Sequence, residues 1–232
     1  MTTIATICAR GGSTGLPRKN VKLLCGKPLI VHTIEHAFAC PGIDRVFVST
    51  DDEEIAKIAR AAGAEVPFIR PAELATETAA KVPVIRHLVE AVERMGCLVS
   101  RIVDLDPTSP LRTLADIDEC IALLDAETDV VITAYPAEKN PYFNMVEAKP
   151  DGNIGLVKPL PGVVARQQAP AVYAMNASIY VWHRHSLEKG IWDGRVKLHV
   201  MPRERSIDID TLLDFEMVEK IMETKYEERR EN

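Results

Sequence analysis

The sequence predicts an α/β protein with a Rossmann-like, mostly parallel sheet, helices on both faces and one small arm. Three observations support this prediction. Short apolar strands alternate with amphipathic helices over residues 4–135, the pattern of sheets with helical crossovers. A glycine-rich turn, ARGGSTGLPRKN at residues 9–20, follows the first strand. The alternation stops over residues 136–175, which contain six prolines. We therefore expect a single domain over residues 1–232, with the arm inserted at about 138–173.

The first part of the chain is expected to form two strand–helix units. The strands are IATICA at residues 4–9 and RVFVST at residues 45–50. A helix is expected over residues 28–39, where Pro28 suits the first turn and apolar side chains recur at helical spacing. Its buried face is expected to be Ile30, Ile34, Ala37 and Phe38. A second helix is expected to start after an aspartate cap in DDEEIAKIARAAG and to end at Gly63.

The remaining elements continue this pattern on both sides of the arm. Further helices are expected over residues 81–95 and 114–125, and a last helix follows Thr211, where Asp214 completes a capping box. The remaining strands are expected at residues 101–105, 129–135, 177–182 and 196–201. Strands that alternate with helices are typical of a parallel sheet.

Composition restricts the class of protein. A formal net charge of −6 argues against a general nucleic-acid binder, although a few local cations suffice for a nucleotide. The five cysteines are scattered without CxxC spacing, as expected for reduced thiols. Only a short apolar run precedes Arg10, so we expect neither a signal peptide nor a membrane span. We expect a cytoplasmic protein without nucleic-acid or membrane partners.

The glycine-rich turn has the composition of an anion site. It combines flexible backbone and hydroxyls with the cations Arg10, Arg18 and Lys19. The glycine spacing matches neither the Walker A nor the G-x-G-x-x-G pattern, and a solvated turn is the alternative. The turn follows the first strand of an α/β sheet, where ligands gather at the carboxyl ends of strands. This position favours phosphate binding.

Asp208 and Asp210, in SIDIDT at residues 206–211, are candidate metal ligands. They alternate with isoleucines, so both carboxylates face the same side of an extended segment. Carboxylate oxygens beside phosphates suit Mg²⁺ or Mn²⁺. The alternative is that one aspartate caps the last helix, but Thr211 is already placed to do so.

Three other stretches contain site candidates. In DLDPTSPLR, residues 104–112, Asp104 is expected to form a turn and Asp106 to belong to the site. Arg70 ends a strand-like stretch at the same edge of the sheet. The third stretch, residues 165–180, contains Arg166, Gln167, Gln168 and Asn176.

Six stretches, in this order, resemble the acylneuraminate cytidylyltransferases, or CMP-sialic acid synthetases. They are ARGGSTGLPRKN, RPAELATETA, PTSPLRT, RQQAP, MNASIY and SIDIDT. The resemblance extends from about residue 4 to residue 217. It implies a nucleotidyltransferase-type fold and a reaction in which CTP and a nine-carbon 3-deoxy-2-keto sugar acid give the CMP-sugar and pyrophosphate.

The resemblance also implies roles for individual residues. Those implied to bind CTP are Ala9, Arg10, Gly11, Gly12, Ser13, Asn20, Arg70 and Ala79. Those implied in catalysis are Arg10, Lys19, Asp208 and Asp210, and the two aspartates are also implied to hold the metal. Those implied to bind the sugar are Asp106, Gln167, Asn176, Tyr180 and Trp192, with Arg166 supplied by a second subunit. The arm is accordingly implied to form a homodimer.

Departures from the sialic acid enzymes indicate a different sugar. Thr14 stands where the loop usually has lysine, which leaves Arg18 as the candidate substitute. Asp106 stands where a glutamine usually faces the sugar, and an ionised carboxylate only accepts hydrogen bonds. DLDPTSPLR, KVPVIRH and NPYFNMVE are similar to the bacterial branch that acts on legionaminic acid, whose C7 amide offers an N–H.

We therefore prefer N,N'-diacetyllegionaminate as the substrate, with N-acetylneuraminate as the alternative. A second alternative is 3-deoxy-manno-octulosonate, against which Gly15 counts because those enzymes usually have arginine there. The alternative of another class is a catalytically silent nucleotide-binding protein. The two carboxylates of Asp208 and Asp210 count against it.

Overall fold

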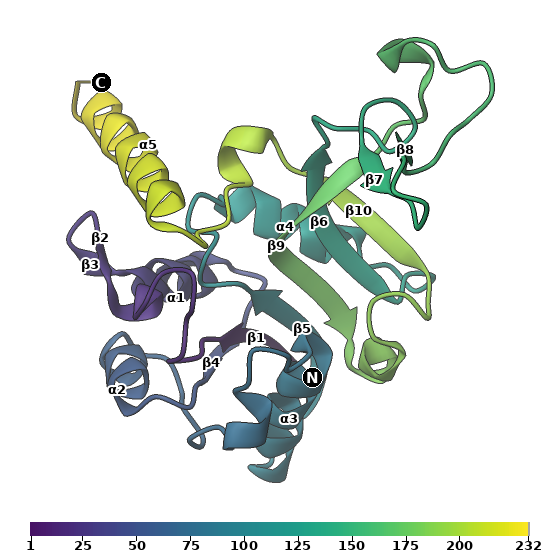
Figure 1. Cartoon of the computed structure of the whole chain (residues 1–232). Helices are drawn as coiled ribbons and strands as arrows, with labels where there is room; N and C mark the ends of the chain where they lie inside the picture. Colours follow the sequence, from purple (N-terminus) through teal and green to yellow (C-terminus); the bar gives the residue numbers. More distant parts are fainter. Residues whose placement is uncertain (232) are drawn as a thin grey trace.

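A six-stranded sheet in the order β10-β6-β9-β5-β1-β4 forms the centre of the protein (Figure 1). The computed structural model describes the backbone of residues 1–231 and the side chains of residues 1–224. Its strands are β1 Thr2–Cys8, β4 Arg45–Ser49, β5 Val99–Leu105, β6 Val130–Pro136, β9 Tyr173–His183 and β10 Val196–Val200. Only β9 runs antiparallel to its neighbours in this sheet. The predicted mostly parallel sheet is confirmed.

Helices cover both faces of this sheet, as predicted. On one face α1 (Leu29–Ala39), α2 (Glu53–Ala61) and α4 (Leu114–Leu123) bury their apolar sides against Ala5, Ile7 and Val103. On the other face α3 (Lys81–Arg94) and the 3₁₀ helix η4 (Arg184–Lys189) pack against Ile4, Ile102 and Trp182. Successive residues of a strand point to opposite faces, so β1 contributes to both cores. The two layers fix the carboxyl ends of the parallel strands in place.

The ends of the helices follow from local sequence. The Asp52 side chain accepts a hydrogen bond from the Ile55 amide at 2.9 Å and caps α2, and Gly63 adopts a left-handed φ of 92° beyond its end. Thr113 and Asp116 form a capping box at the start of α4. Phe38 is an exception among the predicted buried positions. It is 52% exposed because the core covers the side of α1 that carries Ile34 and Ala37, and Phe38 lies outside that side.

The arm leaves the sheet between β6 and β9 and extends away from the body (Figure 1). It contains the antiparallel hairpin β7 (Val146–Ala148) and β8 (Ile154–Leu156), followed by the 3₁₀ helix η3 (Arg166–Gln168). Prolines along this stretch lack the amide that a sheet ladder needs, which keeps its strands short. The hairpin exposes apolar side chains of Val146 and Ile154.

The last helix, α5 (Leu212–Glu231), packs against the first thirty residues of the chain. Phe215 and Val218 pack with Leu16, Leu24 and Leu29 in a small third core. The predicted capping box is present, since the Asp214 carboxylate accepts from the Thr211 amide at 2.8 Å. The short elements nearby are η1 (Lys19–Val21), β2 (Leu23–Leu24), β3 (Lys27–Pro28), η2 (Ala72–Leu74) and η5 (Arg203–Arg205). This packing brings residues 206–211 against the glycine-rich turn.

Of the helices in the described part of the chain, none has the length and apolar character needed to cross a membrane.

Candidate active site

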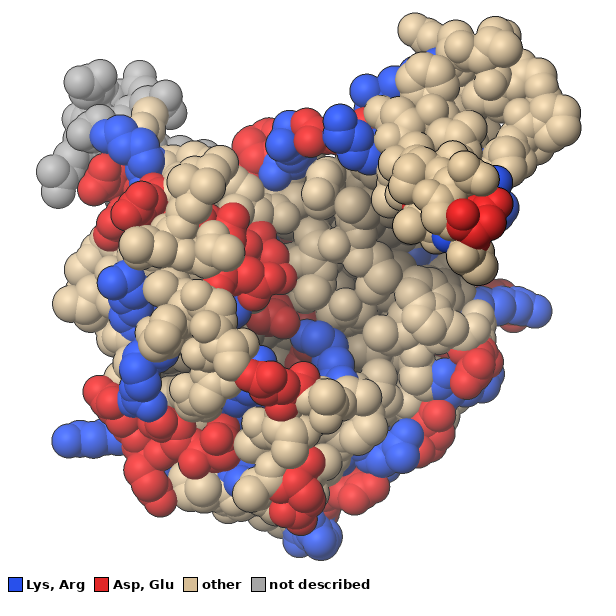
Figure 2. Space-filling view, viewed as in Figure 1, with Lys and Arg blue, Asp and Glu red and all other residues tan. Residues whose placement is uncertain are grey.

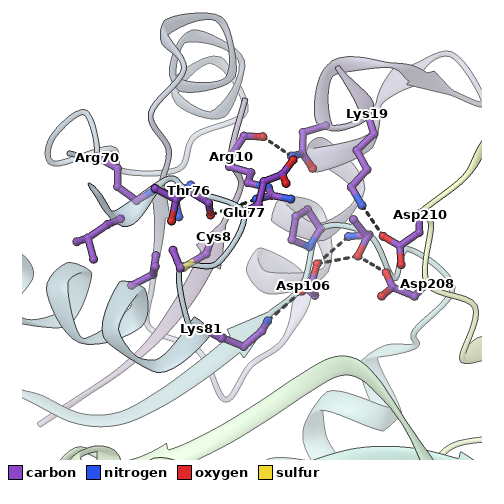
Figure 3. A pocket seen from close by; sticks show the side chains of 16 residues that line it. Cys8, Arg10, Lys19, Arg70, Thr76, Glu77, Lys81, Asp106, Asp208 and Asp210 are labelled. Carbon is purple, nitrogen blue, oxygen red and sulfur yellow. Dashed lines mark hydrogen bonds and ion pairs between the residues drawn. The ribbon is translucent and has the colours of Figure 1, made fainter. Parts of the chain in front are cut away.

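A cleft of about 260 Å³ opens at the carboxyl ends of the parallel strands. Figure 2 shows this face hollowed near its centre, with acidic and basic side chains beside the hollow, and Figure 3 shows the lining. Among the residues that line it are Arg10, Lys19, Asn20, Arg70, Ala79, Asp106, Asp208 and Asp210, all singled out from the sequence. They come from both ends of the chain and from its middle, and the fold brings them together.

The glycine-rich turn and the Asp208–Asp210 segment are in direct contact. Lys19 Nζ donates to the Ile209 carbonyl at 2.8 Å and to Asp210 Oδ1 at 2.9 Å. A Cβ atom at Gly15 would lie 2.4 Å from the Asp210 carbonyl oxygen, far inside van der Waals contact. Only glycine therefore fits at this close approach. The two halves predicted separately from the sequence form one site.

One wall of the cleft, the Arg70 wall (Arg10, Asn20, Arg70 and Ala79), offers polar atoms without partners. Arg70 is 6% exposed, and within the described chain its Nε and Nη2 make no hydrogen bond. Its Nη2 lies 3.5 Å from the Asp51 carboxylate. Asn20 Nδ2 donates to the Arg10 carbonyl at 3.0 Å, but Asn20 Oδ1 is buried and unpaired among these residues. Buried unpaired polar atoms are costly, and a polar ligand that completes their hydrogen bonds would remove this cost.

The opposite wall, the Asp106 wall (Lys81, Asp106, Thr108 and Asp208), is already hydrogen-bonded. The Thr108 hydroxyl lies 2.8 Å from Asp106 Oδ1 and also contacts Asp208 Oδ1. A hydroxyl has one hydrogen, so it can donate to only one of these carboxylates at a time. Burial and the nearby Asp106 charge raise the pKa of Asp208 to about 6. The Asp208 side therefore holds excess negative charge that a proton or a cation would relieve.

A divalent cation suits this excess charge. Asp208 and Asp210 supply carboxylate oxygens, whereas no group of three or more histidine, cysteine or carboxylate side chains in the described residues is arranged as a metal site. Mg²⁺ commonly binds to one or two carboxylates and completes its octahedron with water and substrate phosphates. The residues present fit that pattern.

Lys81, which the sequence reasoning missed, lies between two aspartates. Its Nζ is 3.2 Å from Asp104 Oδ2, 2.9 Å from Asp106 Oδ2 and 5.0 Å from the Tyr180 ring centroid. Burial alone would raise the pKa of Asp106, but Lys81 and then Thr108 hold it near 2. One signal was available in the sequence. Lys81 begins α3, where the helix dipole disfavours a cation. A lysine at this position therefore indicates a nearby anionic partner.

The prediction that Asp104 forms a turn is wrong. Asp104 lies within β5 and is 1% exposed, and its Oδ1 accepts from the Thr6 hydroxyl at 2.8 Å. Burial raises the pKa of Asp104, while the Lys81 charge opposes this shift. Asp104 therefore supports the pocket from within the sheet.

The turn itself contributes less than expected to the lining. Ala9 is buried and its amide donates to the Ser49 carbonyl at 3.0 Å, and the Gly11 amide donates to Asp51 Oδ1 at 3.0 Å. Gly12 and Ser13 continue the turn beside the cleft without lining it. The amides of Ala9 and Gly11 therefore already have acceptors within the protein. They are not free to bind a phosphate in this structure.

Arg18 does not take the place of a loop lysine. Its guanidinium pairs with Asp52 and Glu54 at the start of α2, and it does not line the cleft. Hydrogen bonding to Asp52 raises the pKa of Arg18. Thr14 is exposed beside it. Among the pocket residues, Arg10 and Lys19 are the cations that this turn provides.

The predicted sugar-binding residues separate into different places. Tyr180 is 4% exposed on β9 beneath Lys81. Asn176 is 3% exposed, and its Nδ2 donates to Ser206 Oγ at 2.9 Å while its Oδ1 accepts from the Thr133 hydroxyl at 2.6 Å. With its polar atoms so engaged, Asn176 does not line the pocket but fixes the segment that leads to Asp208. Its predicted sugar contact is wrong for this arrangement.

Gln167 and Arg166 lie exposed in the arm, where Arg166 Nη2 donates to the Ala137 carbonyl at 3.3 Å. Trp192 is 66% exposed and precedes β10, at the amino ends of the parallel strands. The cleft lies at the opposite, carboxyl ends. The prediction that Trp192 binds the sugar is therefore wrong for the pocket of its own chain.

The match to known proteins agrees with this geometry. Residues 4–229 match the family described as cytidylyltransferase. The chain belongs to this family. Similar proteins include the CMP-N,N'-diacetyllegionaminic acid synthase of Campylobacter jejuni, 38% identical, with alignment over 96% of this chain and 95% of that protein. The post-translational flagellin modification protein B of Campylobacter coli is 40% identical over the same shares.

More distant cytidylyltransferases and structures match as well. The N-acylneuraminate cytidylyltransferase of Escherichia coli is 30% identical over 96% of this chain, which spans 52% of that longer protein. A solved CMP:2-keto-3-deoxy-manno-octonic acid synthetase in complex with CTP has a TM-score of 0.73 at 17% identity, over 97% of this chain and 100% of that one. At this identity the likeness shows a shared fold.

Proposed function

We propose that this cytidylyltransferase transfers CMP from CTP to a nine-carbon 3-deoxy-2-keto sugar acid, with N,N'-diacetyllegionaminate as the preferred substrate. The observation that supports this most directly is the meeting of two half-sites. The turn cations Arg10 and Lys19 and the Asp208–Asp210 carboxylates line one cleft, and Lys19 bonds to Asp210. Cations beside a carboxylate pair suit a nucleoside triphosphate that carries a divalent ion.

In the proposed reaction the anomeric hydroxyl oxygen of the sugar bonds to the α-phosphorus of CTP. The bond from that phosphorus to the bridging oxygen breaks, pyrophosphate leaves, and the hydroxyl proton is lost. Such transfers depend on positioning and charge neutralisation. Arg10 and Lys19 neutralise phosphate charge, Asn20 holds the ribose, and Arg70 with the Ala79 backbone binds the base. The carboxylates that line the cleft are groups able to accept the proton.

Asp208 and Asp210 would hold Mg²⁺ or Mn²⁺, which would neutralise phosphate charge and increase the acidity of the attacking hydroxyl. The excess negative charge at Asp208 supports this assignment, because a bound cation relieves it. Water and the substrates would complete its coordination.

Two features favour N,N'-diacetyllegionaminate over N-acetylneuraminate. The Asp106 carboxylate on the sugar side accepts hydrogen bonds, which suits an amide N–H on the sugar. Relatives that are 38% and 33% identical are named CMP-N,N'-diacetyllegionaminic acid synthase. N-acetylneuraminate and 3-deoxy-manno-octulosonate are the competing substrates.

We further propose a homodimer in the cytoplasm. The arm carries exposed apolar side chains on Val146, Ile154 and Val164, which a second copy would cover. Arg166 would then lie near the partner's cleft, and Gln167 beside it. The five cysteines are free, as expected for a reducing compartment.

The proposed function is tested by pyrophosphate release from CTP and Mg²⁺ with a panel of sugar acids. The panel is legionaminic, pseudaminic, N-acetylneuraminic and octulosonic acids, the first as its N,N'-diacetyl form. We expect release to require a sugar acid and kcat/KM to be highest for the legionaminate. If no acid gave pyrophosphate release at saturating CTP, the proposed activity would be contradicted. A catalytically silent nucleotide-binding protein would then be favoured. A higher kcat/KM for N-acetylneuraminate would contradict the choice of sugar alone.

A further inference from the structure

Lys81 is a charged pocket residue to which the reaction above assigns no role. It begins α3, and its Nζ contacts Asp104 Oδ2 at 3.2 Å and Asp106 Oδ2 at 2.9 Å (Figure 3). Its side chain is 27% exposed, so it lies in the wall of the cleft and not in the core.

The hydrogen bonds of Asp106 leave little acceptor capacity for a ligand. Oδ1 accepts from the Thr108 amide at 3.2 Å and from the Thr108 hydroxyl at 2.8 Å, and Oδ2 accepts from Lys81. An ionised carboxylate has about four acceptor sites. While the Thr108 hydroxyl donates to Asp106, one site therefore remains, and the partly exposed Asp106 side chain presents it to the cleft. A single N–H or O–H donor satisfies it.

Asp104 explains why a cation is needed at this point. Asp104 and Asp106 both contact Lys81, and Asp104 is almost fully buried. Without the cation the two carboxylates would repel, and one of them would take up a proton. A protonated Asp106 would lose an acceptor site and gain a donor that faces the ligand.

We propose that Lys81 is a positioning residue that determines specificity, because it keeps Asp106 an ionised, oriented acceptor for one hydrogen-bond donor of the sugar acid. The inference rests on the proposed function, in which Asp106 faces the sugar. The selected ligands are sugar acids with a donor at this point. An amide N–H suits the site best, since it can only donate. Lys81 acts through Asp106 and does not contact the reacting atoms.

A double-mutant cycle between Lys81 and Asp106 tests this role. It is measured with Asp104 intact, because the Asp104 charge is what makes the cation necessary. We expect Lys81→Met to lower kcat/KM for N,N'-diacetyllegionaminate about 10- to 100-fold, the cost of a charge-assisted hydrogen bond, mainly through the sugar KM. The KM for CTP should change by less than about threefold. With Asp106→Asn also present, Lys81→Met should cost less than about threefold.

Controls separate this role from a general effect on folding. Lys27→Met removes an exposed lysine that pairs with Glu35 outside the cleft, and it should leave both KM values unchanged. Lys81→Gln keeps a hydrogen-bond donor without the charge, and it replaces Lys81→Met if that variant does not fold. It should also raise the sugar KM. Equal costs of the Lys81 substitution with and without Asp106, or an unchanged sugar KM in Lys81→Gln, would overturn the assignment of Lys81. Lack of turnover by the unaltered chain would instead overturn the proposed function, and this inference with it.

Discussion

The two walls of the cleft differ in whether their polar atoms already have hydrogen-bond partners. On the Arg70 wall, buried polar atoms of Arg70 and Asn20 are left without partners in the described chain. On the Asp106 wall, Lys81 and Thr108 already occupy most of the Asp106 acceptor sites. The polar atoms of the Arg70 wall need a ligand to complete their hydrogen bonds. The polar groups of the Asp106 wall instead bond to one another and hold one carboxylate in place. A ligand should therefore stabilise the first wall more than the second.

The largest expected effect is at Asp210, which lines the cleft but belongs to neither wall. Its side chain is 70% exposed, so Asp210→Ala should leave the melting temperature nearly unchanged. Loss of a charge that the proposed transfer needs should lower kcat by about 10²- to 10³-fold. Steady-state pyrophosphate release measures this. Asp193→Ala, an exposed aspartate before β10, is the matched control and should retain activity. Unchanged turnover in Asp210→Ala would remove this residue from the site.

The next effect tests the Arg70 wall. Arg70→Met should raise the KM for CTP by about 10- to 100-fold, because it removes charged donors worth about 1.5–3 kcal/mol. The KM for the sugar should not change. The ligand-free variant should lose little stability, because Arg70 Nε and Nη2 make no hydrogen bond within the described residues and Nη2 meets Asp51 only at 3.5 Å. A marked loss of stability without an effect on CTP would show that Arg70 is structural.

A smaller effect concerns the anchoring of the segment that leads to Asp208, where Arg205 at the end of η5 donates to Asp116 Oδ1 on α4 at 2.8 Å. Burial would raise the pKa of Asp116, but Arg205, Thr113 and His199 lower it from 3.8 to about 2. A lowered aspartate pKa adds stability above pH 4 that disappears as the pH falls towards 2. Asp116→Asn should therefore lower the free energy of unfolding by about 2 kcal/mol at pH 7.

Urea unfolding at several pH values measures this effect. The slope of stability between pH 4 and pH 2 should become shallower in Asp116→Asn, since the variant has no carboxylate to protonate at that position. Asp118→Asn, on the exposed side of the same helix, should preserve the slope. An identical slope in both variants would contradict the role of the Asp116–Arg205 pair.

The smallest effect is expected at Arg18, which lies outside both walls. Its partners Asp52 and Glu54 belong to α2, and Arg18 is 44% exposed. Arg18→Ala should change the KM for CTP by less than about threefold and stability by at most about 1 kcal/mol, as for other surface ion pairs. A tenfold rise in the CTP KM would restore Arg18 as the substitute for the missing loop lysine.

Local sequence was sufficient for most of the fold. Apolar periodicity and capping residues such as Asp52 and Thr113 depend on neighbours a few positions away, so the helices could be predicted. The pairing of Asp208 and Asp210 on one side is equally local. The contact of Asp210 with Lys19 could be expected, because both belonged to stretches with complementary chemistry.

The errors arose where long-range pairing decides the outcome. Asp104 faces Thr6 because of the register of β5 with β1, and it meets Lys81 at the start of α3. The DLD sequence encodes neither contact locally. Asn176 and Trp192 were assigned by resemblance, which does not say what a side chain contacts or at which end of the sheet it lies. Their true places follow from the antiparallel course of β9 and the start of β10.

The contact between Lys19 and Asp210 joins residues 191 positions apart. Translation proceeds at about 5–20 residues per second, so the turn leaves the ribosome roughly 10–40 seconds before its carboxylate partner does. The parallel strands are all made by Val200, yet the site still lacks Asp208 and Asp210. The sheet of a nascent chain can thus form before its cleft is complete, because Asp208 and Asp210 are made only after the last strand.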